Sequence, residues 1–337
     1  MKTQIKLKDI AEYTGVTAST VSAALAGKGR ISPATRKIVS DAARELGYKP
    51  NWAAKLLKGN SGTALGLVIS DSAESLLANS AYSNVLEHFL RECKQEGIKP
   101  LFEMFNPEKH KSSLPEMFTD GLATGVLHIG YIPESTKKWL KKYPEYPFVA
   151  FEEPWEYSVR TDNVKGLLRA MEHIAAKGKR KPALMCGPTK FDIHKQTLKG
   201  FKKGVTEFGM QLNPEWIIEQ TSFIEQKQLI NQRLAALKFL LNNRNRPDSL
   251  IISGPTIYIA LTLLAERGIR IPQDISVICI CDSNVAENVF PMITSIERNT
   301  KTMSIAALRM LSQRIKSIVP ENKKIWIEPV FKQRNST

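Results

Sequence analysis

The chain has 337 residues, of which 42% are apolar and 24% are charged. This length and balance predict two or three globular domains, each with a full hydrophobic core. No window approaches the roughly 18 uncharged apolar residues of a membrane span, and the first residues lack the apolar region of a secretory signal. We therefore expect a cytoplasmic protein with no membrane contact.

The positive charge is concentrated at the N-terminal end. Residues 1–62 hold eleven Lys and Arg against four Asp and Glu, a net of +7, which leaves +8 of the total +15 for the other 275 residues. A basic end of this kind is typical of a nucleic-acid-binding module. Charge alone is equally compatible with a solvated basic face, so the choice depends on the helical pattern of the same residues.

Cysteine and histidine spacing predicts neither a metal site nor a cofactor. The four cysteines, Cys93, Cys186, Cys279 and Cys281, lack ligand spacing, and the five histidines are scattered. Cys279 and Cys281 lie in an apolar, strand-like run, where both thiols would point to one face. We expect buried, unpaired thiols, because disulfides are rare in a reducing compartment.

Two short helices joined by a tight turn are predicted at the start of the chain. The first spans residues 7–14, with Leu7, Ile10 and Ala11 at helical spacing on its inner face. Gly15 allows the tight turn, and Thr17 is a suitable N-cap for the second helix.

The second helix has two contrasting faces. At about 100° per residue, Val21, Ala24 and Leu25 share one side. The opposite side carries only small residues, namely Ala18, Ser19, Ser22 and Ala23. Because this face has no long side chain, a partner can approach the backbone closely. Together with the basic flanks, it suits the floor of a DNA major groove.

A third helix begins at Ser32, which reads as an N-cap followed by Pro33 at the first helical position. Gly47 is expected to end it. Its apolar inner face comprises Ile38, Val39, Ala42 and Leu46. Three small helices joined in this way predict a helix-turn-helix domain.

Residues 51–62 are predicted to form a linker with a conditional helix. Residues 52–58 favour a helix but provide only about two turns, and isolated helices shorter than roughly 12 residues are marginal in water. We expect this segment to be helical only when something packs on it.

From residue 64 onward, apolar strands alternate with amphipathic helices. Strands are predicted at residues 65–69, 125–129, 148–151, 183–186, 250–253 and 275–280. Helices are predicted at residues 82–95, 164–176, 195–208, 226–241, 257–267 and 303–317. This alternation predicts doubly wound parallel α/β sheets covered on both faces. Its length predicts two lobes with a cleft between them.

A family resemblance rests first on residues 7–22, which read LKDIAEYTGVTASTVS. They resemble the N-terminal signature of the LacI/GalR (lactose repressor type) regulators. The likeness continues through residues 32–36, 46–51, 64–67, 158–163, 200–201, 246–248, 268–277 and 334–337, so it covers essentially the whole chain. It implies a DNA-binding transcriptional regulator with a small all-α helix-turn-helix head and a two-lobed, periplasmic-binding-protein-like α/β core.

The resemblance also implies the domain boundaries. Residues 1–50 form the DNA-binding head, and residues 51–62 form the hinge helix and linker. Residues 63–337 form the effector-binding and dimerisation core. Within it, the N-lobe takes about residues 63–160 and 291–320, and the C-lobe takes about residues 161–290 and 321–337.

The family binds a pseudo-palindromic operator as a dimer, which assigns DNA contacts by position. Ala18, Ser19 and Ala23 hold the base-reading places, where alanines can touch thymine methyl groups. The less favoured alternative is that two of the three read little. Phosphate contacts are expected from Thr20, Ser22, Lys28, Arg30, Ser32, Thr35, Tyr48 and Asn51. In the hinge, Ala54 and Lys55 belong to the contact set, and Leu57 takes the place of the leucine that kinks the duplex from the minor groove.

The core departs from the family at its usual effector anchors. Thr197, Gly254 and Cys281 stand where an arginine, a polar pair and an aspartate are usual, and Asp282 occupies the next position. This loss removes charge-assisted bonds that give a sugar site its discrimination. The remaining candidate effector residues are Asp71, Glu152 and Phe223. A sugar or derivative, a less polar ligand, a phosphoprotein partner and the absence of any effector all stay open.

Two other functions stand as alternatives. An α/β enzyme with a DNA anchor would need a nucleophile with a base, a metal cluster or a phosphate loop, and no GxGxxG, P-loop or GxSxG motif is present. A secreted binding protein would need a signal and would not need the basic head. We therefore expect a non-enzymatic repressor that acts as a homodimer on double-stranded DNA in the cytoplasm, associated with the nucleoid.

Overall fold

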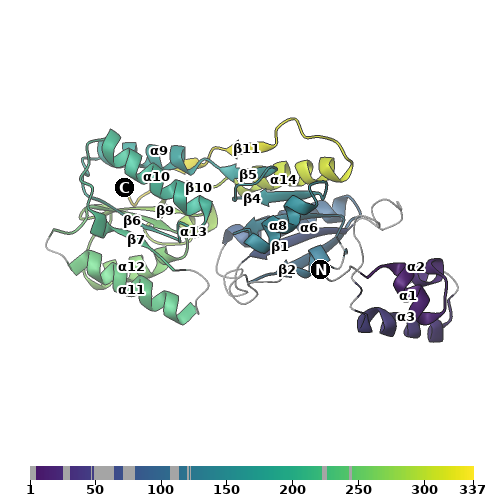
Figure 1. Ribbon diagram of the computed structural model, residues 1–337. Coiled ribbons are helices and arrows are strands. Elements are labelled where there is room, and N and C mark those ends of the chain that lie inside the picture. Colours follow the sequence, from purple (N-terminus) through teal and green to yellow (C-terminus); the bar gives the residue numbers. More distant parts are fainter. Residues whose placement is uncertain are drawn as a thin grey trace. The chain divides into compact units, whose positions relative to one another are not determined.

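The computed structural model (Figure 1) describes residues 5–25, 31–46, 48, 64–70, 80–106, 114–119, 121, 123–221, 226–242 and 245–337. The chain divides into two compact units. One comprises Met1–Ser61 and Glu116–Leu122, and the other comprises Gly62–Pro115 and Ala123–Thr337. Among the described helices, none has the length and apolar character needed to cross a membrane.

The head consists of α1 (Leu7–Thr14), α2 (Ala18–Leu25) and α3 (Pro33–Glu45). The predicted start signals are confirmed. Gly15 has φ 69° in the turn before α2, and Thr17 Oγ1 accepts a 3.2 Å hydrogen bond from Thr20 N. At the start of α3, Ser32 Oγ accepts a 3.1 Å hydrogen bond from Thr35 N. Each cap satisfies a backbone N–H that the helix cannot pair internally.

The head core is small and comprises Ile10, Val21, Ala24, Val39, Ala42 and Ala43. Two residues predicted to face it do not. Leu25 is 38% exposed at the end of α2, and Ile38 is 57% exposed. In α3 the inward set is Val39, Ala42, Ala43 and the partly buried Leu46. This set follows the i, i+3, i+4, i+7 spacing of one helix face, and Ile38 lies about 100° away from Val39.

The N-lobe is built on a six-stranded sheet in the order β11-β5-β4-β3-β1-β2, with every neighbouring pair parallel. Its strands are β1 (Ala64–Ser70), β2 (Lys99–Met104), β3 (Gly125–Gly130), β4 (Phe148–Phe151), β5 (Ser158–Thr161) and β11 (Lys324–Ile327). Its helices are α6 (Ser80–Gln95), α8 (Glu134–Lys142) and α14 (Thr300–Ile315). The short helix α7 (Glu116–Thr119) belongs to the first unit. Phe89 from α6 and Leu311 from α14 pack with Leu67 of β1 in one buried cluster.

The C-lobe sheet also has six strands, in the order β12-β10-β9-β8-β6-β7, with β12 antiparallel to β10 and the other pairs parallel. Its strands are β6 (Pro182–Cys186), β7 (Ile217–Glu219), β8 (Ser249–Ser253), β9 (Ser276–Ile280), β10 (Thr294–Glu297) and β12 (Val330–Lys332). Its helical elements are α9 (Asn163–Ala176), α10 (Asp192–Glu207), η1 (Pro214–Trp216), α11 (Gln226–Asn242), α12 (Thr256–Glu266) and α13 (Ser283–Glu287).

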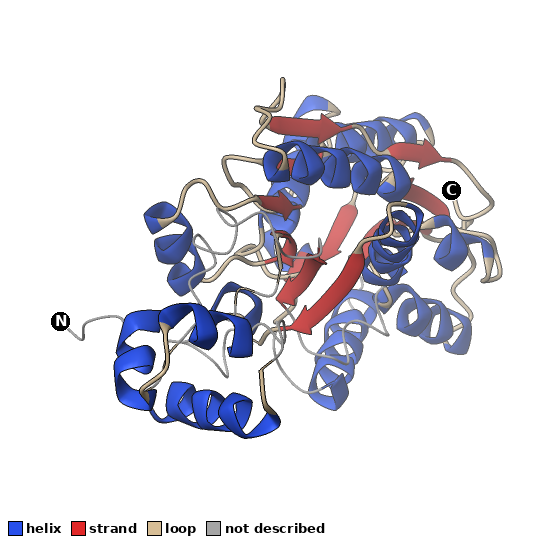
Figure 2. Cartoon of the chain, turned by 90° about the vertical axis from the view of Figure 1, so that its right-hand side faces the viewer, coloured by secondary structure: helices blue, strands red, loops and turns tan. Residues whose placement is uncertain are grey.

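Strand β9 explains how helices cover both faces of this sheet, with α9 and α10 above the strands and α11 and α12 below them in Figure 1. Figure 2 colours the helices and strands of the chain by type. Val277 and Cys279 pack with the apolar residues of α11 and α12. Ile278 and Ile280 pack with those of α9 and α10. Because successive strand residues point to opposite faces, a strand with apolar residues on both faces must be covered on both. The predicted fold class, doubly wound parallel sheets in two lobes, is therefore confirmed.

The chain passes between the lobes after β5, after β10 and after β11. Strand β10 therefore lies in the C-lobe sheet and β11 in the N-lobe sheet. The predicted lobe segments, 291–320 and 321–337, place these two strands in the wrong lobes. The chain completes β10 in one lobe, and β11 in the other, before it crosses. Each of these strands has only four residues, so the apolar pattern in the sequence is too short to show where the chain crosses.

Candidate functional site

The face of α2 that is predicted to read DNA lies opposite the head core. Val21 and Ala24 are buried in that core, whereas Ser19 is exposed. Ala18, Ser22 and Ala23 are partly exposed. The head can therefore offer this face to a partner without losing its own packing.

Hydroxyl groups gather at the starts of α2 and α3. Thr17 Oγ1 lies 2.8 Å from Ser19 Oγ and 2.8 Å from Thr20 Oγ1. Ser32 Oγ lies 2.8 Å from Thr35 Oγ1. Helix N-termini present backbone N–H groups and the positive end of the dipole, so hydroxyls there are suited to phosphate oxygens.

Tyr48 anchors the end of the head. Its backbone N–H donates a 2.8 Å hydrogen bond to Ala43 O, its ring packs against the head core, and burial raises the pKa of its phenol. The other predicted DNA contacts, Lys28, Arg30, Asn51, Ala54, Lys55 and Leu57, lie outside the described residues, as does the predicted hinge helix.

In the core, the predicted effector residues follow the carboxyl ends of the strands. Glu152 follows β4, Gly254 follows β8, and Cys281 and Asp282 follow β9. Open parallel sheets bind ligands at this edge, because the loops that leave it converge there. Asp71 and Phe223 lie outside the described residues.

Asp282 links the two lobes. Its Oδ2 accepts a 3.0 Å hydrogen bond from Asn84 Nδ2 on α6 of the N-lobe, and Thr300 Oγ1 donates to its Oδ1 at 3.4 Å. The carboxylate is buried. Asp282 therefore follows a C-lobe strand, while its side chain accepts hydrogen bonds from the N-lobe.

Glu152 is buried and has a left-handed backbone with φ 65°. Its carboxylate accepts hydrogen bonds from Thr161 N at 2.9 Å and from Thr161 Oγ1 at 2.5 Å. Burial raises the pKa of Glu152, and the nearby positive charge of Arg298 acts against that shift. Its two oxygens are thus already bound to the end of β5.

The three positions that depart from the family offer no charged group that could bind a ligand. Thr197 is buried and its hydroxyl donates a 2.8 Å hydrogen bond to Ile193 O within α10. Cys281 packs in the apolar cluster that faces α11 and α12. Gly254 has φ 63°, and its N–H donates a 3.0 Å hydrogen bond to Ile280 O.

Polar residues that the sequence did not single out also join the lobes. Arg160 Nη1 on β5 lies 3.0 Å from Asp192 Oδ2 at the start of α10, and the guanidinium lies 3.9 Å from the ring centroid of Trp326. Glu153 Oε1 accepts a 3.1 Å hydrogen bond from Asp192 N. Burial raises the pKa of Glu153 to about 7. An acidic pair directly after β4 was the available signal for Glu153.

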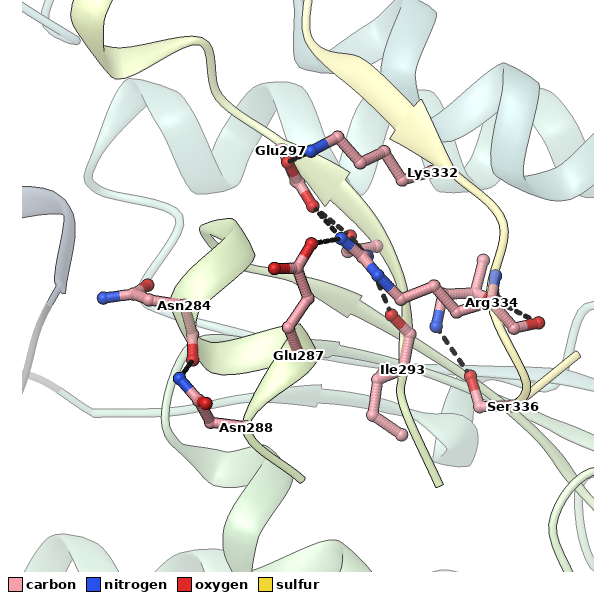
Figure 3. Close-up of polar contacts among 10 residues, drawn as sticks. Asn284, Glu287, Asn288, Ile293, Glu297, Lys332, Arg334 and Ser336 are labelled. Atoms are coloured by element: carbon pink, nitrogen blue, oxygen red, sulfur yellow. Dashed lines mark hydrogen bonds and ion pairs between the residues drawn. The ribbon is translucent and has the colours of Figure 1, made fainter. Parts of the chain in front are cut away.

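The C-terminal segment fixes the short helix that follows Asp282 (Figure 3). Arg334 Nη2 lies 2.7 Å from Glu287 Oε1 on α13 and 2.8 Å from Glu297 Oε1 on β10. Ser336 Oγ accepts a 2.8 Å hydrogen bond from Thr294 N. The end of the chain thereby holds α13, and with it the turn that presents Asp282.

The described residues offer no group of three or more His, Cys, Asp or Glu that could hold a metal ion. All four cysteines are free and buried, as predicted.

Two family models match the chain. Residues 6–51 match the bacterial regulatory proteins of the lacI family, and residues 171–337 match a periplasmic binding protein-like domain. The chain belongs to the LacI family. Its helix-turn-helix head and two-lobed core make it a DNA-binding transcriptional regulator with a domain of the ligand-binding type.

Curated relatives of this LacI-family chain extend over nearly its whole length. It is 26% identical to the HTH-type transcriptional regulator CelR of Thermobifida fusca, in a match that covers 98% of the chain and 97% of CelR. It is 26% identical to the HTH-type transcriptional repressor PurR of Haemophilus influenzae, covering 92% of the chain and 90% of PurR.

Solved structures share the LacI-family fold. A complex of the transcriptional regulator CelR with cellobiose has a TM-score of 0.72 at 23% identity and covers 99% of this chain and 100% of that one. The lac repressor dimer bound to operator and the anti-inducer ONPF has a TM-score of 0.69 at 20% identity, covering 99% of each chain. At these identities the likeness establishes the fold alone.

Proposed function

We propose that this regulator represses transcription by binding a pseudo-palindromic operator as a homodimer, with an affinity set by a ligand between its lobes. The observation that carries the DNA-binding part is the small, hydroxyl-bearing face of α2 opposite the head core. Such a face can enter the major groove, because nothing on it holds the helix away from the base edges.

The head residues divide into two kinds of DNA contact. Ala18, Ser19 and Ala23 would face base edges, where alanines contact thymine methyl groups and the serine hydroxyl bonds a donor or an acceptor. The hydroxyls at the starts of α2 and α3 would contact phosphates, together with Lys28, Arg30, Tyr48 and Asn51. Ala54, Lys55 and Leu57 would follow in the minor groove, with Leu57 as the kinking wedge.

A homodimer is supported by the symmetry of such operators and by exposed apolar side chains on the C-lobe. Phe290 is 96% exposed, and Tyr258 and Met292 are also exposed. A C2 dimer that covers these side chains would supply two heads, as a pseudo-palindromic operator with half-sites about one helical turn apart requires.

The ligand is proposed to act through the contacts between the lobes. The Asn84–Asp282 and Arg160–Asp192 interactions each join the N-lobe to the C-lobe. A ligand that binds one lobe arrangement more tightly shifts the population toward it, and DNA affinity changes by the same coupling free energy. The solved CelR complex with cellobiose makes a carbohydrate or derivative the first class to test; a protein coeffector is the second.

No catalytic step is proposed, since the curated relatives are named as transcriptional regulators. A repressor of this kind works on chromosomal DNA, so we place it with the nucleoid in the cytoplasm.

Selection of bound fragments from sheared genomic DNA of the source organism tests the DNA-binding proposal and identifies an operator. We expect a few enriched fragments that share a pseudo-palindrome. Leu57→Ala should still fold but bind the recovered operator more weakly, by a few kcal/mol, because the wedge no longer favours the kinked duplex. Random recovery by the wild-type protein would refute the proposal, and full affinity of Leu57→Ala would refute only the wedge.

A further inference from the structure

Arg298 lies in one of the segments that connect the lobes. It follows β10 of the C-lobe sheet and precedes α14 of the N-lobe. In the sheet register, Ile296 pairs with Ile280, so Arg298 comes level with Asp282 at the carboxyl edge of the C-lobe strands. This edge is where open parallel sheets bind ligands.

The guanidinium of Arg298 has no protein partner in the described part of the chain. Its Nε is buried and makes no hydrogen bond, and no described carboxylate forms an ion pair with it. The acids nearby are already engaged: Glu152 by Thr161, and Asp282 by Asn84 and Thr300. Burial also favours the neutral form of Glu152 by raising its pKa. A partly buried cation without a paired anion is unfavourable and points to an absent partner.

His194 adds a second donor at the same edge. Gly187, directly after β6, donates its N–H to His194 Nδ1 at 3.3 Å, so the ring proton is on Nε2. Burial and the positive charge of Arg298 lower the pKa of His194 to about 3, which keeps the ring neutral. A Cβ on residue 187 would lie 2.2 Å from His194 Nε2, so the ring rests directly on Gly187. Among the described residues, nothing accepts the Nε2–H.

We infer that Arg298 and His194 form an anion subsite within the interlobe ligand site, so that the effector carries a carboxylate or a phosphate. The inference rests on the proposed ligand control. Arg298 would bind two oxygens of the anion through its planar fork, and His194 would donate a neutral hydrogen bond to a third oxygen or to a neighbouring hydroxyl. Because Arg298 lies between β10 and α14, an anion held there sits on a connection that must adjust when the lobes move.

The sugar class that fits is therefore an acidic or phosphorylated one. Thr197 and Cys281 replace the arginine and aspartate that the family usually presents to a neutral sugar. Arg298 supplies a charge from a different element, so selectivity in this protein would come from the anionic group and less from the ring hydroxyls.

Isothermal titration of the full-length protein tests the subsite with glucose 6-phosphate, glucuronate and inorganic phosphate, and with neutral glucose and cellobiose for comparison. We expect at least one anionic sugar to bind tenfold or more tightly than glucose. Arg298→Gln should weaken anion binding tenfold to a hundredfold, because it removes a charge-assisted pair. Arg309→Gln, which removes an exposed arginine from α14, should leave it unchanged.

The wild-type preference needs no variant. If neither glucose 6-phosphate nor glucuronate binds more tightly than glucose, or if no anionic probe binds at millimolar concentration, the inference is overturned. Equal anion affinity of folded Arg298→Gln and wild type also overturns it. If Arg298→Gln fails to fold, Arg298→Lys is used instead, because lysine keeps the positive charge but lacks the planar fork. Arg298→Lys should bind the anion more weakly than the wild type. An unchanged affinity would contradict the inference. The same preparations are also tested for recovery of genomic fragments, which separates the two proposals. DNA binding without anion binding refutes only the anion subsite. Absence of DNA binding by the wild-type protein refutes the proposed function.

Discussion

Arg160 Nη1 lies 3.0 Å from Asp192 Oδ2, so a strand of the N-lobe is ion-paired with the first residue of a helix in the C-lobe. The same residue, Asp192, donates its backbone N–H to Glu153 Oε1 of the N-lobe. The start of α10 is thus bound by a basic residue, Arg160, and an acidic residue, Glu153, of the other lobe. Polar contacts of this kind can be exchanged between two discrete arrangements, as a ligand-controlled lobe movement requires.

Removing the carboxylate of Asp192 should destabilise the protein strongly. Both side chains of the Arg160–Asp192 pair are largely buried, so Asp192→Ala leaves an unpaired guanidinium out of bulk water. We expect the free energy of unfolding to fall by about 3 kcal/mol in urea denaturation. Adding Arg160→Met should recover part of this loss, because the unpaired charge is then absent.

The exposed Lys323–Glu156 pair is the matched control. Glu156→Ala should cost under about 1 kcal/mol, because solvent screens an exposed pair. Equal losses in Asp192→Ala and Glu156→Ala would show that the interlobe pair has no special weight.

Glu153 should make stability depend on pH near neutrality. Its pKa rises from the ordinary 4.5 to about 7 in the folded protein, mainly through burial. Between about pH 4.5 and 7, the folded protein therefore keeps a proton on the Glu153 carboxyl that the unfolded chain has already released. The stabilisation is complete below pH 4.5 and is lost as the pH rises through 7, by an amount on the order of 3 kcal/mol.

Glu153→Gln isolates this contribution, because the amide oxygen can still accept from Asp192 N and cannot ionise. The unfolding temperature of the variant, relative to wild type, should rise between pH 5 and pH 8 in calorimetry. Glu145→Gln, at an exposed position, should give a constant difference over the same range. Parallel melting curves for Glu153→Gln and wild type would contradict the raised pKa.

Arg334 should contribute strongly to the stability of the C-lobe edge on which Asp282 lies. It pairs with Glu297, and both side chains are nearly fully buried. Arg334→Ala should lower the free energy of unfolding by about 3 kcal/mol, and Arg334→Lys should recover less than half, because lysine lacks the planar fork. Lys332→Ala removes a more exposed partner of the same carboxylate and should cost about 1 kcal/mol or less. A larger loss in Lys332→Ala than in Arg334→Ala would contradict this ranking.

The N-cap of α2 offers a local test in the head. Thr17→Ala removes the oxygen that accepts from Thr20 N, at a cost of about 1 kcal/mol. Hydrogen exchange in peptides that span α2 should quicken about fivefold if it occurs by local opening, while peptides from α9 serve as an internal control. Thr17→Ser keeps the oxygen and should exchange at the wild-type rate; fast exchange in Thr17→Ser would show that the cap is not the cause.

The central parts of the fold were predictable because their patterns are strong. Strand β4 is apolar throughout, β8 is apolar between its two terminal serines, and both are buried. Helices α1 and α3 carry clear turn, proline and capping signals. The strands not predicted, β2, β5, β7, β10, β11 and β12, are short or polar. Strand β2 lies at a sheet edge with several exposed residues, so half of its side chains carry no apolar signal.

The candidate site was harder to predict than the fold. Asp282 was identified by its place after a strand, but its bond to Asn84 joins residues 198 positions apart, which no local pattern reveals. Arg298 resembles any surface arginine in the sequence. Only the sheet register, which aligns β10 with β9, brings it beside Asp282.

Operator titration measures directly whether this regulator binds one DNA sequence in preference to another. Full-length protein is titrated by fluorescence anisotropy against a labelled operator from the genomic selection and against a scrambled duplex, at several salt concentrations. We expect binding to the operator at least about a thousandfold tighter than to the scrambled duplex, with log K falling linearly as log salt rises. Equal affinity for the two duplexes, or an affinity that does not change with salt, would contradict this expectation.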